Sequence, residues 1–68
     1  SLPKEKRLVE YRKALRALNE KICWLTEKQY QAENRANKEE VILYQQQIQE
    51  TEFRKIKCLT AIEQLAEE

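Results

Sequence analysis

The sequence predicts an all-α protein, a coiled coil of long helices, on the strength of three observations. Ala, Glu, Lys, Leu and Arg together supply 39 of the 68 residues, a composition typical of long helices. Glycine is absent and the only proline is Pro3, so no later residue interrupts a helix on steric grounds. Apolar residues recur in alternating steps of three and four, the spacing of a coiled-coil seam. We expect a single coiled-coil segment over residues 1–68, as a fragment of a longer protein.

The clearest apolar pattern lies in the first half of the chain. With Leu8 at heptad position a, the a and d positions hold Leu8, Tyr11, Leu15, Leu18, Ile22 and Leu25. The same positions continue through Gln29, Ala32 and Ala36. A strict a/d seam favours packing against another helix, whereas a helix in a globular core shows a broader stripe. We therefore interpret this half as a coiled-coil helix.

A second seam follows in a different register. Its positions hold Val41, Tyr44, Ile48, Thr51, Lys55, Cys58, Ile62 and Leu65, and Ile56, Leu59 and Ala66 broaden the stripe. The register shifts by two residues somewhere between positions 29 and 41. A heptad coil absorbs insertions of three or four residues, and a shift of two is harder to accommodate. This register break decides the architecture.

Two architectures fit the register break. In the first, one near-continuous helix runs through it, supported by strong helix formers and by the i,i+4 pair of Arg35 and Glu39. In the second, the chain folds back as an antiparallel αα-hairpin with its turn near Asn34–Asn37. Asn37 would then cap the second helix with Glu40 three residues later, and Asn34 would adopt the left-handed conformation. We favour the continuous helix, because no glycine or proline marks a turn.

The charge distribution favours an antiparallel arrangement in either architecture. Basic residues crowd the segment from Lys4 to Arg16, and the chain ends in Glu63, Glu67 and Glu68. Antiparallel pairing brings these opposite charges together, and such pairs set orientation better than they set stability. The expected partner is a second copy of the chain, as a homodimer or higher oligomer, or another helical protein.

We predict that the seam residues form the interface with that partner. They are Leu8, Tyr11, Leu15, Leu18, Ile22, Leu25, Val41, Tyr44, Ile48, Cys58, Leu59, Ile62 and Leu65. Trp24 and Tyr30 lie off the seam of the first half and are candidates for exposed anchors, since aromatic residues often dominate protein–protein interfaces. Gln29 and Lys55 place polar groups in the seams, where such residues commonly set register or oligomeric state.

No residue pattern supports catalysis, a cofactor or a metal. The chain has neither His nor Asp and no glycine-rich phosphate loop. Cys23 and Cys58 are too few and too far apart for a zinc site, and we expect both to be reduced thiols. A net charge of +1 and the lack of an aromatic stacking platform argue against a nucleic-acid partner. No apolar run is long enough to span a membrane.

The sequence therefore predicts a non-enzymatic coiled-coil segment for oligomerisation or scaffolding, in a cytoplasmic protein of cytoskeletal, trafficking or signalling type. The alternative is a monomeric hairpin adaptor that presents one face to a globular partner. In architecture alone, such a hairpin resembles the antiparallel coiled-coil fingers that bind small GTPases. A third and weaker interpretation is a basic helix, Lys4 to Arg16, that docks on nucleic acid or an anionic membrane.

Overall fold

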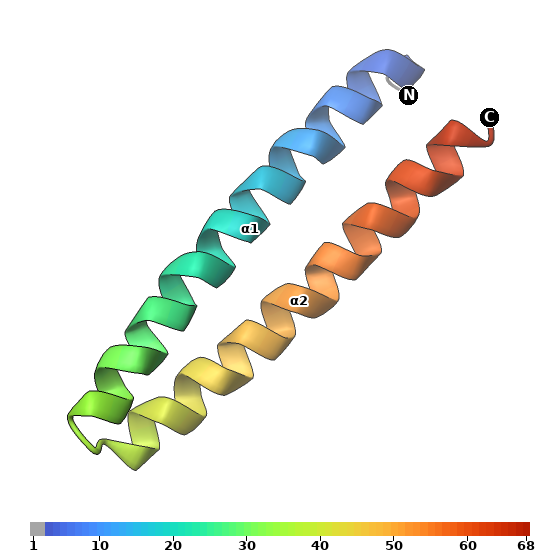
Figure 1. The fold of residues 1–68 in the computed structure, drawn as a ribbon. Helices are drawn as coiled ribbons and strands as arrows, with labels where there is room; N and C mark the ends of the chain where they lie inside the picture. Colours follow the sequence, from blue (N-terminus) through green and yellow to red (C-terminus); the bar gives the residue numbers. More distant parts are fainter. Residues whose placement is uncertain (1–2) are drawn as a thin grey trace.

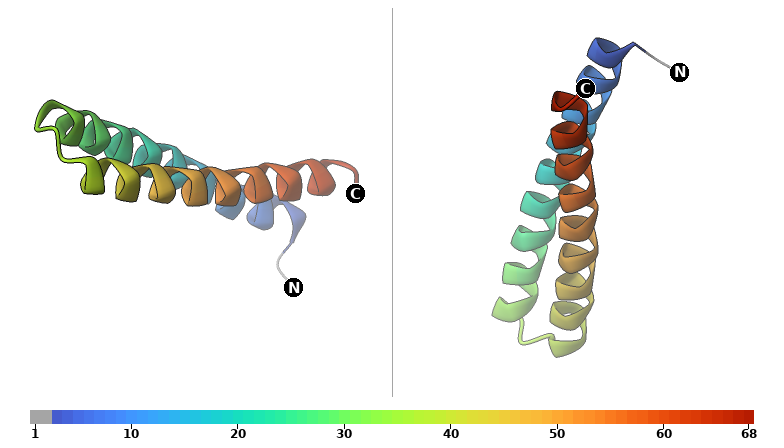
Figure 2. Two further views of the ribbon diagram at one scale, coloured as in Figure 1. Left: turned by 90° about the horizontal axis from the view of Figure 1, so that it is seen from below. Right: turned by 90° about the vertical axis from the view of Figure 1, so that its right-hand side faces the viewer.

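The computed structural model describes residues 3–68 as two long helices packed side by side (Figure 1). Helix α1 covers Lys4–Asn34 and helix α2 covers Lys38–Ala66. The hairpin measures 49 × 16 × 14 Å, and the start of α1 and the end of α2 lie together at one end. Figure 2 shows that the helices stay side by side in two further views and cross at a shallow angle. The near-continuous helix that we favoured is wrong, and the hairpin with its turn near Asn34–Asn37 is confirmed.

A Schellman motif ends α1. The N–H of Asn37 donates to the Ala32 carbonyl at 2.9 Å, and the N–H of Ala36 donates to the Glu33 carbonyl at 3.0 Å. The residue in the left-handed conformation is Ala36, with φ at 55°, and our assignment of that role to Asn34 is wrong. A residue with a Cβ adopts this conformation at a cost of about 1–2 kcal/mol, which is why glycine usually occupies it. The turn therefore forms without the glycine that normally marks it.

The start of α2 is held by side chains. Oδ1 of Asn37 accepts a hydrogen bond from the Glu40 N–H at 3.2 Å, which confirms the predicted N-cap. The Glu40 carboxylate pairs with Arg35 across the turn. In a continuous helix Arg35 would instead have lain beside Glu39, four residues on. This ion pair therefore joins the two helices at the turn.

Both predicted seams lie along the contact between α1 and α2. Every seam residue named from the sequence in Leu8–Ala32 and in Val41–Leu65 is buried or half-buried. The most deeply buried are Leu25, Ala32, Thr51, Cys58 and Leu65, at 0–8% exposure. Because the chain turns back between the seams, the turn absorbs the two-residue shift of register. Thr51 places a hydroxyl in the seam and satisfies it by donating to the Gln47 carbonyl at 2.7 Å.

The antiparallel register is the same at both ends of the hairpin. Nη2 of Arg7 lies 2.9 Å from Oε1 of Glu68 beside the chain ends, and Arg35 pairs with Glu40 beside the turn. The same number of residues separates Arg7 from Arg35 in α1 and Glu40 from Glu68 in α2. The pairing of α1 with α2 is therefore not shifted between the two ends of the hairpin. The basic start of the chain and its acidic end meet as the charge pattern predicted.

We expect Ala36→Gly to stabilise the hairpin by about 1 kcal/mol, because glycine adopts the left-handed conformation without a Cβ penalty. Such a gain corresponds to a rise in melting temperature of about 4–8 °C, measurable by circular dichroism. As a matched control, Ala17→Gly on the exposed side of α1 should cost about 1 kcal/mol. A loss of stability in Ala36→Gly would contradict this description of the turn.

We expect Leu25→Ala to destabilise the hairpin by about 2–5 kcal/mol, because Leu25 is 0% exposed and its removal leaves a cavity in the seam. Urea unfolding followed by circular dichroism measures the change. Leu43→Ala, at a side chain that is 48% exposed, is the comparison and should cost less than about 0.5 kcal/mol. Equal losses in the two variants would show that the seam is assigned incorrectly.

Candidate protein-interaction surface

The residues predicted to contact a partner mostly join the two helices of this chain. All of them except Leu59 are buried or half-buried between α1 and α2. Leu59 is 38% exposed and lies beside the seam of α2. Folding of the hairpin thus accounts for the burial of the seam, and any surface for another molecule must be sought on the outside.

Large apolar side chains remain on that outside. They are Val9, Trp24, Tyr30, Ile42, Leu43, Phe53, Ile56 and Leu59, with exposures from 38% to 60%. Trp24 at 56% and Tyr30 at 59% are exposed, as the sequence predicted. Val9, Ile42, Leu43 and Phe53 were not among the surface residues predicted from the sequence. Scattered exposed apolar residues are common on proteins, so their arrangement decides whether they form a surface.

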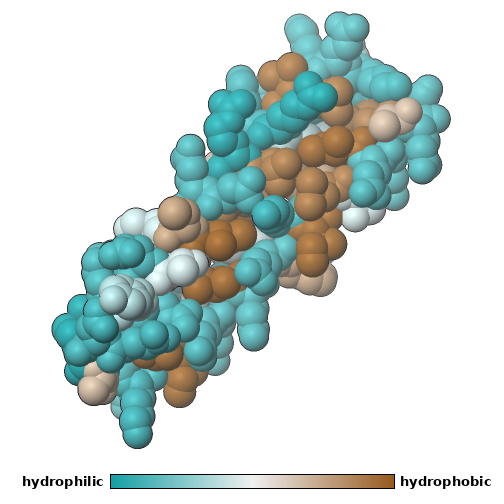
Figure 3. Space-filling model, in the orientation of Figure 1, coloured by the Kyte–Doolittle hydropathy of each residue, from teal (hydrophilic) through white to brown (hydrophobic). Residues whose placement is uncertain are grey.

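Heptad position places most of these side chains on one side of the hairpin. In an antiparallel pair the e positions of both helices border one side of the seam, and the g positions border the other. We define the apolar face by the exposed apolar residues at b and e positions, Val9, Cys23, Tyr30, Ile42, Ile56 and Leu59, although other b and e positions hold charged residues such as Arg16 and Glu52. Both helices contribute to it. Figure 3 views the hairpin from this side and shows brown apolar atoms along much of its length.

Between the helices, the apolar face is hollowed near the turn. A groove of about 230 Å³ is lined by Thr26, Gln29, Tyr30, Glu33 and Ile48. A second hollow of about 440 Å³ beside the turn is lined by Glu33, Ala36, Lys38, Val41 and Ile42. Each hollow is lined by residues of both helices and includes one b-position residue, Tyr30 in the groove and Ile42 beside the turn. The hollows give the apolar face a concave region that can receive side chains of another protein.

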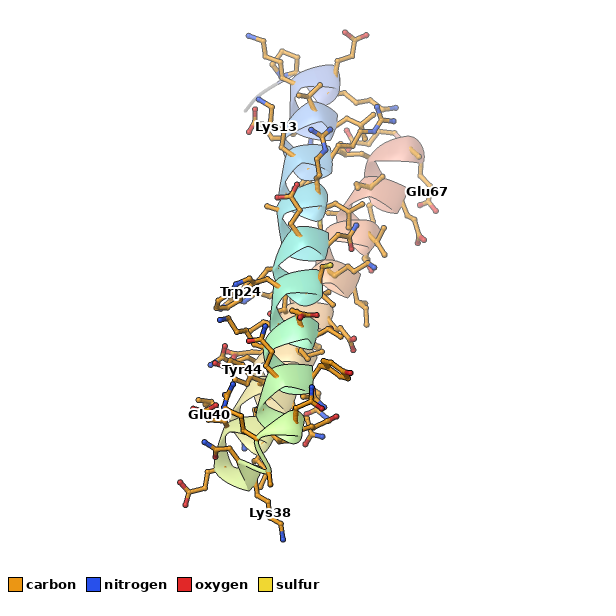
Figure 4. The ribbon with its side chains drawn as sticks, turned by 60° about the vertical axis from the view of Figure 1, so that its left-hand side comes forward. Lys13, Trp24, Lys38, Glu40, Tyr44 and Glu67 are labelled. Atoms are coloured by element: carbon orange, nitrogen blue, oxygen red, sulfur yellow. The ribbon has the colours of Figure 1, made fainter. Side chains whose placement is uncertain are left out.

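The opposite side of the hairpin is charged. We define the charged face by the g residues Arg7, Lys21, Lys28, Arg35, Glu40, Arg54 and Glu68, which include both ion pairs between the helices. Trp24 and Leu43 lie at c positions beside this face. The Nζ of Lys28 lies 5.5 Å from the centroid of the Trp24 ring, a contact that shields one side of the indole. Figure 4 shows Trp24 and Glu40 projecting on the same side of the hairpin.

Trp24 and Tyr30 therefore do not form one anchor site. Six residues separate them, which places them about 120° apart around α1. Tyr30 borders the groove of the apolar face, whereas Trp24 belongs to the side that carries the ion pairs. Of the two predicted anchors, only Tyr30 lies with other exposed apolar side chains from both helices.

The hairpin also exposes more surface than a compact protein of its mass. Its accessible surface is 5445 Å², and a folded monomer of 8.2 kDa has about 4500 Å². In residues 3–68 the buried apolar side chains are only Leu25, Ala32, Cys58 and Leu65. The two helices thus enclose a thin core, and much of their apolar surface stays in contact with water.

Residues 3–68 contain neither a metal-binding cluster nor a membrane-spanning helix. Within residues 3–68 no group of three or more Cys or Glu side chains is arranged to hold a metal ion. Neither α1 nor α2 contains an apolar stretch long enough to cross a bilayer. Cys23 and Cys58 are both free thiols, the first exposed and the second buried.

Comparison with known proteins adds no relative. No protein-family model matches the chain, and no curated protein or solved structure compared with it is similar. A function must therefore be argued from the surface of the hairpin. Its two sides differ in the property that governs association, since one exposes apolar side chains and the other is bordered by ion pairs.

We expect the two thiols to differ in reactivity. At low protein concentration Cys23 should react freely with iodoacetamide, because its side chain is exposed. Cys58 is 8% exposed, and its Sγ lies 3.2 Å from the Tyr11 carbonyl between the helices. Its modification requires the helices to separate, and each 1.4 kcal/mol of opening free energy slows it about tenfold. Mass spectrometry of timed samples measures both rates, and equal rates would contradict the seam.

Proposed function

We propose that the chain is a protein-interaction module, a helical hairpin that binds another protein through its apolar face and carries out no catalysis. The observation that carries this proposal is the set of five large side chains, Val9, Tyr30, Ile42, Ile56 and Leu59, exposed together on one side. A helix that packs only in a two-stranded coil carries charged residues at positions beside its seam. In α2 the first three e positions hold polar or charged residues, and the last two hold Leu59 and Ala66.

Burial of the apolar face would supply useful binding energy. A fully buried large apolar side chain contributes roughly 1.5–3 kcal/mol, and these five side chains still expose between 38% and 60% of their surface. Their remaining burial is worth about 4–8 kcal/mol in total, before the entropy of association is subtracted. This amount suits a reversible interaction that other contacts reinforce.

The hairpin architecture favours the adaptor alternative over a long scaffolding rod. A rod would need the seam residues for contacts between chains, whereas here the seam joins two helices of one chain. The basic segment at the start of α1 is also a weaker candidate, because two of its six basic residues are paired, Arg7 with Glu68 and Lys13 with Glu10. The apolar face thus has the strongest physical reason to bind a partner.

Photo-crosslinking at two neighbouring positions tests this proposal. The photoreactive residue p-benzoylphenylalanine replaces Ile42 in one protein and Leu43 in the other, and each is expressed in cells where the chain naturally occurs. The two side chains are 54% and 48% exposed and lie about 100° apart around α2, so that Ile42 borders the apolar face and Leu43 the charged face. We expect a discrete protein adduct from position 42 and at most a trace from position 43, measured by gel electrophoresis and mass spectrometry.

A second substitution connects the adduct with the apolar face. Ile56→Glu, made in the protein with the photoreactive residue at position 42, should reduce the adduct about tenfold, since it places a charge in the proposed contact. Ile56 is 60% exposed, so the change should leave the hairpin folded. Equal crosslinking from positions 42 and 43, or an adduct that Ile56→Glu leaves unchanged, would refute the proposed function.

A further inference from the structure

Building on this proposed function, we propose that the occupant of the apolar face is a second copy of the chain. Two hairpins would pack apolar face to apolar face and form a four-helix bundle. Their two-fold axis would run parallel to the helices, so that α1 of each copy lies over α2 of the other and both turns lie at the same end. The apolar pattern, the dimensions of the face and its charges each support this arrangement.

The apolar pattern is that of a bundle helix. A two-stranded coil needs apolar residues at a and d only, whereas helices in a larger bundle add a neighbouring position. In α2 the added positions are e, with Leu59 and Ala66, and b, with Ile42 and Ile56. The added residues all lie on the same side of the hairpin. A second layer of helices on that side would complete the core that two helices leave thin.

The dimensions of the face fit a two-helix partner. The hairpin is 49 Å long and 16 Å wide across its Cα atoms, which corresponds to about 800 Å². A flat footprint of this size is of the same order as the accessible surface, about 800 Å², that each partner buries in a standard protein interface. A single helix of about 10 Å diameter would fill the central groove and leave the outer b positions of both helices uncovered. A second hairpin covers Tyr30 and Val9 on α1 together with Ile42 and Ile56 on α2.

Two pairs of charges beside the apolar face are complementary under this two-fold axis, whereas Arg16 and Glu52 on the same side are level with Leu59 and Cys23 of the second copy. Since Arg7 lies opposite Glu68, Glu63 of α2 is level with Arg12 of α1. Near the turn, Lys38 of α2 and Glu33 of α1 differ in position along the hairpin axis by about one helical turn. When α1 lies over α2 of the second copy, Arg12 faces Glu63 and Glu33 faces Lys38. These four residues form no ion pair within the described hairpin, residues 3–68.

The end-for-end alternative lacks this complementarity. It would stack α1 on α1 and α2 on α2 of the second copy, and the helices would run in opposite directions. Arg12 would then lie near the turn half of another α1, and Glu63 near the turn half of another α2. The opposite charges would be separated, so the arrangement with both turns at one end is favoured.

Sedimentation equilibrium from about 1 to 500 μM tests the dimer on the purified chain. We expect a mass of twice 8.2 kDa at the upper concentrations. Ile42→Glu and Ile56→Glu should weaken dimerisation at least tenfold, and Leu43→Glu on the opposite side should not. A monomer throughout the range would overturn this inference. The proposed function would still stand in that case if crosslinking from position 42 captured a different protein, and would fall if position 42 captured nothing.

The native thiol of Cys23 reports whether the apolar face is covered. Cys23 belongs to this face and is exposed, so its alkylation should slow at least tenfold between the monomeric and dimeric concentrations. Unchanged alkylation of Cys23 would place the contact elsewhere and overturn the inference.

A distance between the two turns tests their placement at one end. In a Cys23→Ser background, a nitroxide at Glu39→Cys labels the exposed start of α2, while the native Cys58 remains buried. Electron–electron resonance should give a separation of roughly 25–35 Å, as expected across the diagonal of a four-helix bundle. A separation near or above the 49 Å length of the hairpin would overturn the proposed arrangement.

Discussion

The turn at residues 35–37 is the constraint on which the rest of this structure depends. It holds Ala36 in the left-handed conformation, which is unfavourable for any residue with a Cβ. Two backbone hydrogen bonds, the Asn37 cap and the Arg35–Glu40 pair stabilise the turn. The reversal brings two seams of different register into contact. Burial of Leu25, Ala32, Cys58 and Leu65 between the helices then offsets the local cost. Tertiary packing thus stabilises a turn that local preference alone would not select.

The same turn creates the difference between the two sides of the hairpin. With the helices antiparallel, the g positions of both border one side and carry Arg7–Glu68 and Arg35–Glu40. The e and b positions border the other side, where α1 contributes Tyr30 and α2 contributes Ile56 and Leu59. One side thereby carries an ion pair at each end of the hairpin, and the other carries most of the exposed large apolar side chains. The proposal of a binding face follows from this division of polar and apolar positions.

The seams could be predicted residue by residue, because heptad spacing is a local property of the chain. Leu25 and Leu65 are buried where the spacing places them, and the Asn37 cap follows from a short-range motif. The choice between hairpin and continuous helix could not be predicted in the same way. It depended on Ala36, whose left-handed conformation carries no sequence signal, and on contacts between distant residues.

The surface was only partly visible in the sequence. Exposure of Trp24 and Tyr30 followed from their positions off the seam, but their separation onto different sides required the direction of the second helix. The apolar residues that broaden the second stripe, Ile56 and Leu59, were a signal for the face now described. The place of Ile42 on this face could not be predicted, because it depends on how the turn aligns α2 with α1.

The two-residue difference between the seams also limits how copies of this chain can exchange parts. If the turn straightened, two chains could in principle swap their second helices and form a long rod. In such a rod the seams around Leu25 and Ile48 would point to widely different sides of one continuous helix. A partner chain lying straight alongside could not cover both. The mismatch therefore acts as a barrier to swapping, and it keeps each pair of helices within a single chain.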